Sequence, residues 1–466
     1  MNWTDWITFL QWFFLLYFIG VNSGYILLNL LSLRALRTYM EARSLDDMPA
    51  YSGYEPPVSI IIPAYNEEAT IVATVRTLLD LDYPEFEVVV VNDGSQDNTF
   101  AILQREFSLV FFPEAYWQRI KGKGVRAIYR SATSPNLRVI EKENGGKADA
   151  LNAGINASRY PLFCAVDADS ILQRDGLRRA VQPFLENPIT VASGGAVRIA
   201  NDCGLKDGFI TSIALPKSWL ALMQIVESQR TFLFGAMGWS ALNAVLIVSG
   251  AFGLFRKETV IEAGGYLTGT SGEDMELILR LHYMLRVKGR PYHITFVPDP
   301  IFWSMAPETS RALKAKRLGW QRRLAESLSL NMPLLFNRKG ATVSWLAFPF
   351  VTIFEWLGPM FEVMGYVFMI SGFALGLISW QVFVVFLLVA IGFGMLLSGI
   401  ALLLEELSFH IYHKPTQLVK LLIAVLLENF GYRQRVSLWR FIGLMRWLFN
   451  RTHEPKETVE IPAVEA

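Results

Sequence analysis

The stretch Val58–Pro63, with the sequence VSIIIP, begins a series of short apolar runs that alternate with helical patterns. A run of this length and composition is typical of a strand that is buried on both faces. Similar runs predict strands at Phe86–Val91, Leu137–Ile140 and Leu162–Val166. Because helical periodicity lies between the runs, the sequence predicts a parallel α/β sheet with right-handed crossovers.

Polar residues follow three of these predicted strands. Asn66, Asp93 and Asp169 each stand just beyond the carboxyl end of a strand. Open α/β sheets bind their ligands in the crevice at that edge, so we expect one binding site there. The glycine patterns of Rossmann dinucleotide sites and of P-loops do not follow any strand in the sequence, which leaves both kinds of site without support.

Three motifs suggest chemistry. Asp167–Asp169 (DAD) places two carboxylates where they can share Mg²⁺ or Mn²⁺ with phosphate oxygens. Gly145–Lys147 begins a predicted helix, where backbone N–H groups and an ammonium suit a diphosphate; an ordinary capped helix is the alternative. Glu273 and Asp274 begin another helical pattern, and one of them can take a proton from a hydroxyl nucleophile, with simple N-capping as the alternative.

Composition excludes several classes of function. The 466 residues are 52% hydrophobic and 18% charged, with a net charge of +1, so no global basic field for nucleic acid exists. Two cysteines cannot form a disulfide scaffold or a four-cysteine zinc site. No histidine precedes His282, so chemistry in the preceding residues depends on carboxylates, hydroxyls, Lys or Arg.

A charge-free segment near the N-terminus predicts a membrane span. Trp6–Leu33 is long enough to cover ~42 Å as a helix, more than the ~30 Å of a hydrocarbon core. A cleaved signal peptide is the alternative, which this length disfavours. Arg34, Arg37 and Arg43 follow directly and predict that the C-terminal end of the helix is cytoplasmic.

A second apolar block follows the predicted sheet. Val363–Leu404 carries no charge and is long enough for two spans joined near Ser379–Gln381. Ala341–Leu357 is either a further span or an interfacial helix. Leu418–Leu427 is short for a span, and the arginines and aromatic residues at 433–451 predict an amphipathic helix on the inner leaflet.

Several motifs, in order, resemble those of membrane-embedded family 2 glycosyltransferases. The resemblance covers residues from about 55 to 430, and it is to the cellulose, hyaluronan and poly-N-acetylglucosamine synthases, most nearly the last group. The matching motifs are Pro63–Glu67, Asn92–Asp97, Gly145–Ala148, Asp167 with Asp169, Ser249–Ala251, Gly264–Tyr266 and Gly272–Asp274.

This resemblance implies a GT-A, Rossmann-like α/β domain embedded between transmembrane α-helices, with the domain in the cytoplasm and the helices in the inner membrane. The expected divisions are 1–45 for the first helix and its basic flank, 46–310 for the catalytic domain with an insertion at about 106–136, 311–340 for interfacial helices, 341–452 for further membrane helices, and 453–466 for a disordered tail. We expect the insertion to be a surface loop or flap.

The resemblance also implies roles for residues. The donor-binding residues would be Tyr65, Glu67, Asp93, Lys147, Asp167, Ser249 and Gly250, and the ligands of Mg²⁺ or Mn²⁺ would be Asp169 and Asp167. Asp274 would be the general base, with Glu273 beside it. Trp320, Arg317 and Arg322 would bind the acceptor.

One motif departs from the family pattern. The synthases carry Q-x-x-R-W, and here the Gln is Lys316 and the Arg is Gly319, while Trp320 is retained. Trp320 can still stack on an acceptor sugar. Arg317, Arg322 and Arg323 are candidates to replace the missing guanidinium. The change bears on processive polymerisation more than on glycosyl transfer.

Three functions remain open on these grounds. The first is an inverting transferase that adds sugar from a UDP-sugar, with UDP-GlcNAc or UDP-Glc expected, to a growing β-linked polysaccharide, with membrane lipids and accessory export subunits as partners. The second is transfer of one sugar to a lipid-linked or other membrane acceptor, which the altered Q-x-x-R-W favours. The third is a catalytically inactive membrane receptor for a nucleotide.

Overall fold

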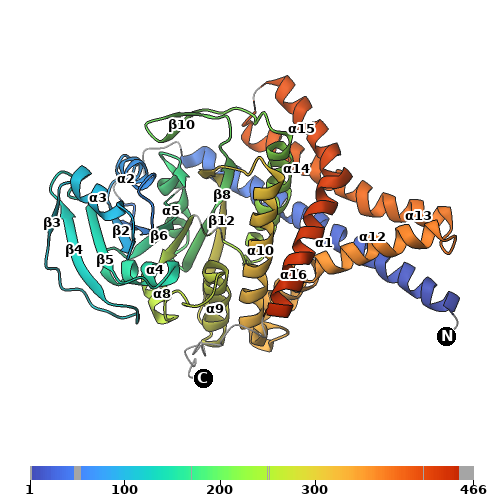
Figure 1. The fold of residues 1–466 in the computed structure, drawn as a ribbon, viewed down its shortest axis with the longest axis horizontal. Helices are drawn as coiled ribbons and strands as arrows, with labels where there is room; N and C mark the ends of the chain where they lie inside the picture. The colour runs from blue at the N-terminus through green and yellow to red at the C-terminus, as the bar shows by residue number, and fades with distance from the viewer. Residues whose placement is uncertain are drawn as a thin grey trace.

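The computed structural model describes residues 3–46, 54–168, 170–248, 250, 252–412 and 414–450. An α/β domain forms one end of the molecule, and long helices form the other (Figure 1). Within the described residues, the larger sheet has the strand order β3-β4-β5-β2-β1-β6-β11-β8-β12-β7.

The centre of this sheet is the predicted parallel unit. β5 (Leu137–Lys142), β2 (Phe86–Asp93), β1 (Val58–Ala64) and β6 (Leu162–Val166) lie side by side and run in the same direction. Their carboxyl ends therefore meet at one edge, as the sequence predicted for the polar residues that follow β1 and β2. Asp169, predicted at the same edge, lies outside the described residues.

Helices cover both faces of the parallel strands. Alternate residues of β1 point to opposite faces, so Ile60 packs in the cluster that includes α2 (Ile71–Leu79), while Ile61 packs in the cluster that includes α4 (Lys147–Ala157). This double burial is why the strand is a continuous apolar run rather than an alternating one.

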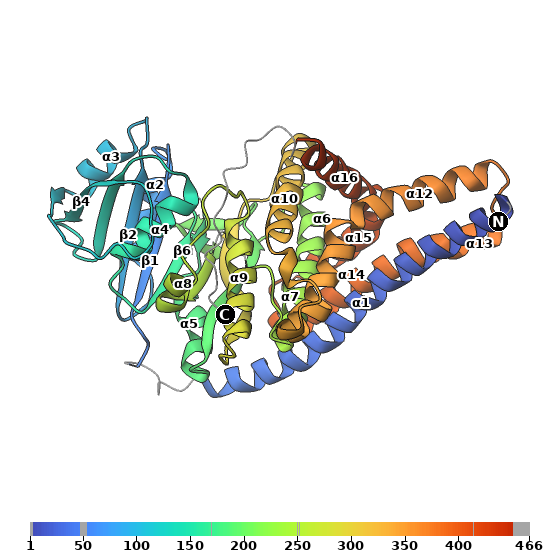
Figure 2. The ribbon, with the colours of Figure 1, turned by 90° about the horizontal axis from the view of Figure 1, so that it is seen from below.

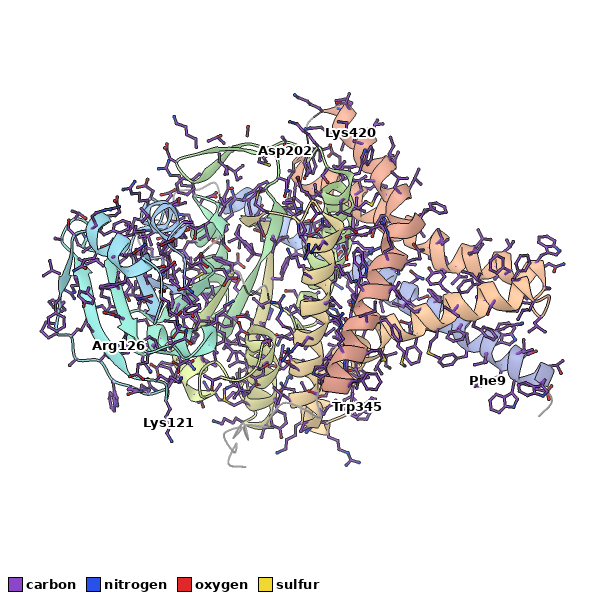
Figure 3. All side chains as sticks on the ribbon, viewed as in Figure 1. Phe9, Lys121, Arg126, Asp202, Trp345 and Lys420 are labelled. Carbon is purple, nitrogen blue, oxygen red and sulfur yellow. The ribbon has the colours of Figure 1, made fainter. Side chains whose placement is uncertain are left out.

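The segment predicted as a surface loop or flap at about 106–136 contains an irregular, largely exposed stretch at 112–124, but a strand lies on each side of that stretch. β3 (Leu109–Phe111) and β4 (Val125–Ser131) extend the sheet in antiparallel fashion beyond β5. The segment between them is anchored where the Arg119 side chain pairs with Glu258 at 2.7 Å. Lys121 and Arg126 lie at the lower edge of the α/β domain, at the end of the molecule opposite Phe9 (Figure 3).

The other edge of the sheet mixes strand directions. β11 (Phe252–Arg256) runs antiparallel to β6 and to β8 (Thr190–Ile199), while β12 (His293–Ser304) runs parallel to β8. Further helices are α6 (Trp219–Ser228), α7 (Gly235–Ala241), α9 (Glu273–Val287), α10 (Ser310–Leu330), α15 (Pro415–Leu427) and α16 (Arg433–Asn450). The remaining bounds are α3 (Thr99–Glu106), β7 (Ile171–Leu172), α5 (Gly176–Glu186), β9 (Gly204–Lys206), β10 (Phe209–Ser212), α8 (Lys257–Glu262) and α11 (Phe348–Phe350).

α1 (Trp3–Asp46) runs from the protruding helices to the underside of the α/β domain (Figure 2). Its Phe18 packs with Met369 of α12 (Gly358–Ala374) and with Phe386 of α13 (Trp380–Leu387). Towards its other end, Leu36 joins a cluster that includes Ala196 of β8. One helix therefore connects the apolar bundle to the sheet.

Two helical stretches among the described residues, Trp3–Glu41 and Trp380–Phe409, are long and apolar enough to cross a membrane. The second continues from α13 into α14 (Phe393–Phe409). A third candidate is Val343–Trp356 together with α12, a pair that bends by 47°. Ala341–Leu357 thus contains the first of the two helices in this bent pair. The next candidate span begins at Trp380, within the predicted junction at Ser379–Gln381.

The arginines at 433–451 were predicted to face the inner leaflet of the membrane, and for one of them this is wrong. In α16 the Arg440 guanidinium pairs with Glu355 at 2.9 Å and lies 4.6 Å from the ring centroid of Trp320. Arg440 therefore points to protein rather than to headgroups. The predicted tail at 453–466 lies outside the described residues.

Candidate active site

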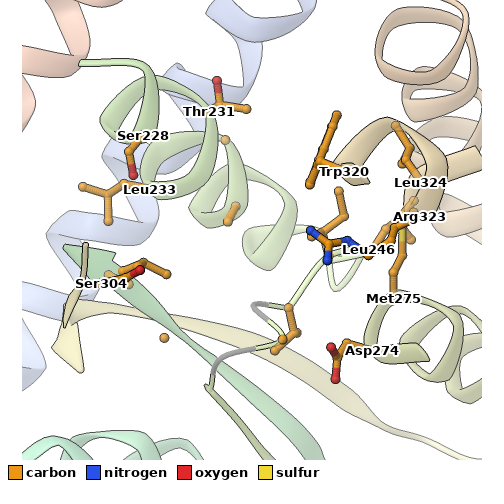
Figure 4. Close-up of a pocket in the computed structure, with 18 of the residues that line it drawn as sticks. Ser228, Thr231, Leu233, Leu246, Asp274, Met275, Ser304, Trp320, Arg323 and Leu324 are labelled. Carbon is orange, nitrogen blue, oxygen red and sulfur yellow. The ribbon is translucent and has the colours of Figure 1, made fainter. Parts of the chain in front are cut away.

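A cavity of about 620 Å³ lies where the edge of the sheet meets the helices. Lys147, Asp167, Gly250, Glu273 and Asp274 line one part of it. Figure 4 shows Asp274 on the side of the cavity near Trp320 and Arg323, with Ser228, Thr231 and Ser304 on the other side. The cavity also reaches Tyr25, Phe350 and Glu355 of the apolar helical part.

Lys147 lies between the carboxylate predicted to bind the metal and the two carboxylates predicted to include the general base. Its Nζ lies 2.8 Å from Asp167 Oδ1, 3.5 Å from Glu273 Oε1 and 3.7 Å from Asp274 Oδ2. Burial alone would lower the pKa of Lys147, but Asp274, Asp167 and Glu273 raise that pKa above its ordinary value. Lys147 is therefore a fixed positive charge between the Asp167 carboxylate and the predicted base.

The two acids of the Gly272–Asp274 motif begin α9, as predicted. The positive end of the helix favours carboxylates there. Gly272 lets α10 approach closely, since an added Cβ would lie 2.7 Å from the carbonyl oxygen of Arg323, and Ser327 Oγ donates to the Gly272 carbonyl at 2.9 Å. α9 and α10 are therefore held together at the cavity.

Glu273 titrates at an unusually high pH for a carboxyl group. Burial, and then the adjacent Asp274, raise the pKa of Glu273 to about 7. Below that pH the Glu273 carboxyl is neutral, and above it the carboxylate adds a negative charge beside Asp274. The negative charge of ionised Glu273 thus lies beside the position predicted to take the proton of a hydroxyl, and it favours removal of that proton.

We expect UDP release to increase as the pH rises through about 7, the pKa of Glu273. Glu273→Gln keeps this side chain neutral, so the increase should disappear while the fold is retained. The measurement is kcat as a function of pH, from about pH 5.5 to about pH 8.5, for the wild type and for Glu273→Gln. A rise that persists unchanged in the variant would contradict this assignment.

Gly250 lies against the predicted base. A side chain at Gly250 would collide with the Asp274 carboxylate and would force that carboxylate to move. The predicted donor residue Ser249 and the predicted metal ligand Asp169 lie outside the described residues.

The predicted nucleoside residues lie apart from the lining of this cavity. Tyr65 follows β1 and is 45% exposed, and Glu67 Oε2 accepts a hydrogen bond from Thr70 Oγ1 at 2.7 Å. The turns that follow β1 and β2 are linked, because Asn66 Oδ1 accepts from the Gln96 amide at 2.8 Å. The structure therefore builds one rim from these two motifs.

Asp93 is at that rim but is only 3% exposed. Its Oδ2 accepts from the Gly146 amide at 2.7 Å, and its Oδ1 accepts from the Gly145 amide at 3.0 Å. The glycine amides that the sequence suggested for a diphosphate are thus already occupied by a carboxylate. Contact between Asp93 and a nucleoside stays a prediction.

α10 presents four of the residues that the sequence singled out. Trp320 and Arg317 line the cavity, although the Arg317 guanidinium is bound by Glu227. Arg322 pairs with Glu326 at 2.7 Å and is not part of the cavity lining. Arg323 lines the cavity, and within the described part of the chain its side chain makes no hydrogen bond or ion pair.

From the sequence, Arg323 was only one of three candidates to replace the guanidinium missing from Q-x-x-R-W. Glu227 was not singled out at all. The signal for Arg323 was weak, since its position follows from how α10 rotates against α9. Glu227 lies on α6, in a stretch that carries no recognisable motif. Both residues line the same cavity as Asp274.

The chemistry of the acids fits a divalent cation held together with a diphosphate. Among the described residues there is no group of three His, Cys, Asp or Glu side chains that could hold a metal alone. Mg²⁺ and Mn²⁺ in nucleotide sites take one or two carboxylates and complete their shells with phosphate oxygens and water. Asp167, a cavity carboxylate at the end of β6, suits such a site.

Comparisons with known proteins agree with this geometry. The sequence profile described as glycosyl transferase family 2 matches residues 59–257. The poly-β-1,6-N-acetyl-D-glucosamine synthase of Staphylococcus epidermidis is 27% identical over 264 residues, which are 56% of this chain and 53% of the relative. The corresponding synthase of Staphylococcus aureus strain COL is 28% identical over the same shares of the two chains. This chain therefore matches about half the length of these curated relatives.

A solved structure shares the fold. A mannosyltransferase from Pyrobaculum calidifontis, determined with GDP-Man and Mn²⁺, aligns with a TM-score of 0.51 and 19% identity over 89% of this chain and 99% of that chain. The predicted GT-A architecture is confirmed, with apolar helices that flank the domain. Residues 59–257 therefore form a domain that matches glycosyl transferase family 2.

Proposed function

We propose that the protein is an inverting glycosyltransferase that takes a sugar from a UDP-sugar, UDP-GlcNAc or UDP-Glc, and adds it to a growing β-linked polysaccharide. One observation carries the proposal: Asp167, Lys147 and Asp274 meet in a single cavity that extends to Trp320. Donor-side, base and acceptor-side groups thus line one space. The synthases that the chain resembles make a β-linked polymer, which supports the choice of product.

In the proposed mechanism Asp274 takes the proton from the acceptor hydroxyl, which attacks the anomeric carbon from the side opposite the diphosphate. A direct displacement of this kind inverts an α-linked donor to a β-glycoside. Lys147 binds the diphosphate and balances negative charge as the sugar leaves. Asp167, with Asp169, would hold Mg²⁺ or Mn²⁺, which offsets charge on the leaving diphosphate when bound.

We place the catalytic domain in the cytoplasm and the apolar helices in the inner membrane. Arg34 and Arg37 follow the apolar part of α1, and positive residues favour the cytoplasmic side. UDP-sugars are cytoplasmic, so the orientation puts the cavity on the side of its donor. Membrane lipids and export subunits are partners that this placement would allow.

The function is tested with purified full-length protein, a panel of UDP-sugars and Mg²⁺ or Mn²⁺. We expect UDP release from one donor and a product ladder that contains β-linkages. No release from any donor, with UDP binding retained, would instead favour the nucleotide receptor.

A second candidate is the transfer of a single sugar to a lipid-linked acceptor. Tyr25 and Phe350, which lie in the candidate spans, line the same cavity as Asp274, and this favours an acceptor that reaches the site from the bilayer. A product of one added sugar would support this candidate, and a ladder of lengths would exclude it.

We propose that Arg323 takes the place of the guanidinium missing from Q-x-x-R-W. We expect Arg323→Ala to lower kcat/KM by ~10-fold to 100-fold, because a charged hydrogen bond contributes about 1.5–3 kcal/mol. Arg322→Ala is the matched control, since Arg322 is the adjacent arginine but pairs with Glu326 away from the cavity. Equal losses in the two variants, measured as UDP release, would contradict the assignment.

A further inference from the structure

Lys142, a residue that no motif includes, is buried in a charge cluster beside the donor side of the cavity. It ends β5, pairs in register with Asp93 of β2, and is 0% exposed. Its ammonium lies 2.6 Å from Asp93 Oδ1, 2.5 Å from Asp149 Oδ2 and 2.6 Å from the Glu143 carbonyl oxygen. An ammonium has three donors, and all three are used here.

The Asp93 side of the cluster holds the turn before α4. The Asp93 carboxylate accepts from the amides of Gly145 and Gly146, and its backbone carbonyl accepts from Asn144 Nδ2 at 2.9 Å. Gly146 has φ of +87°, a conformation that L residues rarely adopt. The next residue is Lys147, so this turn fixes where α4 begins and where the Lys147 side chain leaves the backbone.

The Asp149 side of the cluster holds the same turn from within α4. A side chain at Gly145 would collide with the Asp149 carboxylate, so the turn and the carboxylate are in close contact. Asp149 Oδ1 also accepts from the Lys123 amide at 3.1 Å, which ties in the segment between β3 and β4. Without Lys142, two buried carboxylates would face each other with no counter-ion.

We propose that Lys142 is a positioning residue for the donor diphosphate, which acts through Asp93 and Asp149 to hold the Gly145–Gly146 turn and thereby Lys147. The proposal rests on the proposed function, because it assigns the diphosphate to Lys147. It also gives Asp93 a role at the donor site that requires no contact with the nucleoside.

A merely structural role for Lys142 is the competing explanation, and the same strand offers a matched control. Arg138, four residues earlier on β5, is 2% exposed, lies 2.6 Å from Glu87 Oε2 and lies 3.0 Å from Glu114 Oε2. Arg138 also joins two carboxylates and also anchors the β3–β4 segment. It differs from Lys142 in making no contact with the turn that precedes Lys147.

The experiment compares full-length Lys142→Met and Arg138→Met with the wild type. UDP binding is measured by calorimetry with Mg²⁺ present, the donor KM and kcat by UDP release, and the fold by the thermal unfolding midpoint. Lys142→Met is expected to raise the UDP Kd and the donor KM by ~10-fold or more, with a smaller change in kcat. Arg138→Met is expected to lower the unfolding midpoint with UDP Kd within ~2-fold of wild type.

Asp149→Asn serves if Lys142→Met fails to fold, because it keeps the shape and a hydrogen-bond acceptor for the Lys123 amide. It is expected to raise the UDP Kd in the same direction. Unchanged UDP Kd in folded Lys142→Met or Asp149→Asn would overturn the inference, as would an equal rise in Arg138→Met. Failure of the proposed function looks different: the wild type would then bind UDP but release none from any donor.

Discussion

Replacement of Asp274 by Asn is expected to reduce UDP release and polymer formation by ~10²-fold to 10⁴-fold, the usual contribution of a positioned general base. The amide keeps the size of the side chain but cannot accept the proton of an acceptor hydroxyl. Because Asp274 is 3.7 Å from the Lys147 ammonium, the change also removes one of the charges that surround Lys147. Donor KM should change far less than kcat, since the lost interaction belongs to the transition state.

The control for this variant is Asp202→Asn. Asp202 lies near Lys217 on the surface at 3.8 Å and is not part of the cavity lining, so its activity should match the wild type. Rates are measured by UDP release at saturating donor, with product length followed on the same samples. Asp274→Asn with wild-type activity would remove Asp274 as the base and leave Glu273 as the remaining candidate.

Replacement of Lys147 by Met is expected to cost ~10²-fold or more in kcat/KM for the donor. The variant loses a charged contact to the diphosphate, for which about 1.5–3 kcal/mol is usual, and it also removes the ammonium that lies between Asp167, Glu273 and Asp274. Both effects disfavour a donor that itself brings negative charge. UDP affinity and donor KM are the measurements that report this change.

Lys147→Arg is the conservative comparison, because it restores the charge with a longer, planar group. We expect it to recover part of the UDP affinity but not the full rate, since a guanidinium differs in shape from the ammonium between the three carboxylates. If Lys147→Met bound UDP as tightly as the wild type, the diphosphate could not lie at the start of α4.

The central strands could be predicted from the sequence because each is buried on both faces. β1, β2 and β6 have continuous apolar runs, and the polar residues that follow β1 and β2 lie at one edge as expected. The strands outside this central unit were not predicted, β8 and β12 among them; β3 and β7, of three and two residues, carry too few side chains for a periodic pattern.

Some residues of the candidate site could be predicted from the sequence, and others could not. Lys147, Glu273 and Asp274 were recognisable because each begins a helix and lies in a motif. Lys142 was not recognisable, because its importance comes from Asp93 and Asp149, which are distant in sequence and meet it only after the sheet forms. The inward direction of Arg440 likewise depends on Glu355 in another helix, whereas its sequence context is that of a basic surface.

The length of α1 affects how the protein can be handled. At 1.5 Å per residue, a helix of this length extends for ~66 Å, and its second half packs against the α/β domain, since Leu36 lies in a cluster with Phe234 and Tyr39 donates a hydrogen bond to Asp299. A fragment that starts at residue 54 would lack α1, and it would expose to water the apolar residues that pack against the second half of this helix. Preparations should therefore retain the whole helix in a lipid nanodisc or detergent micelle.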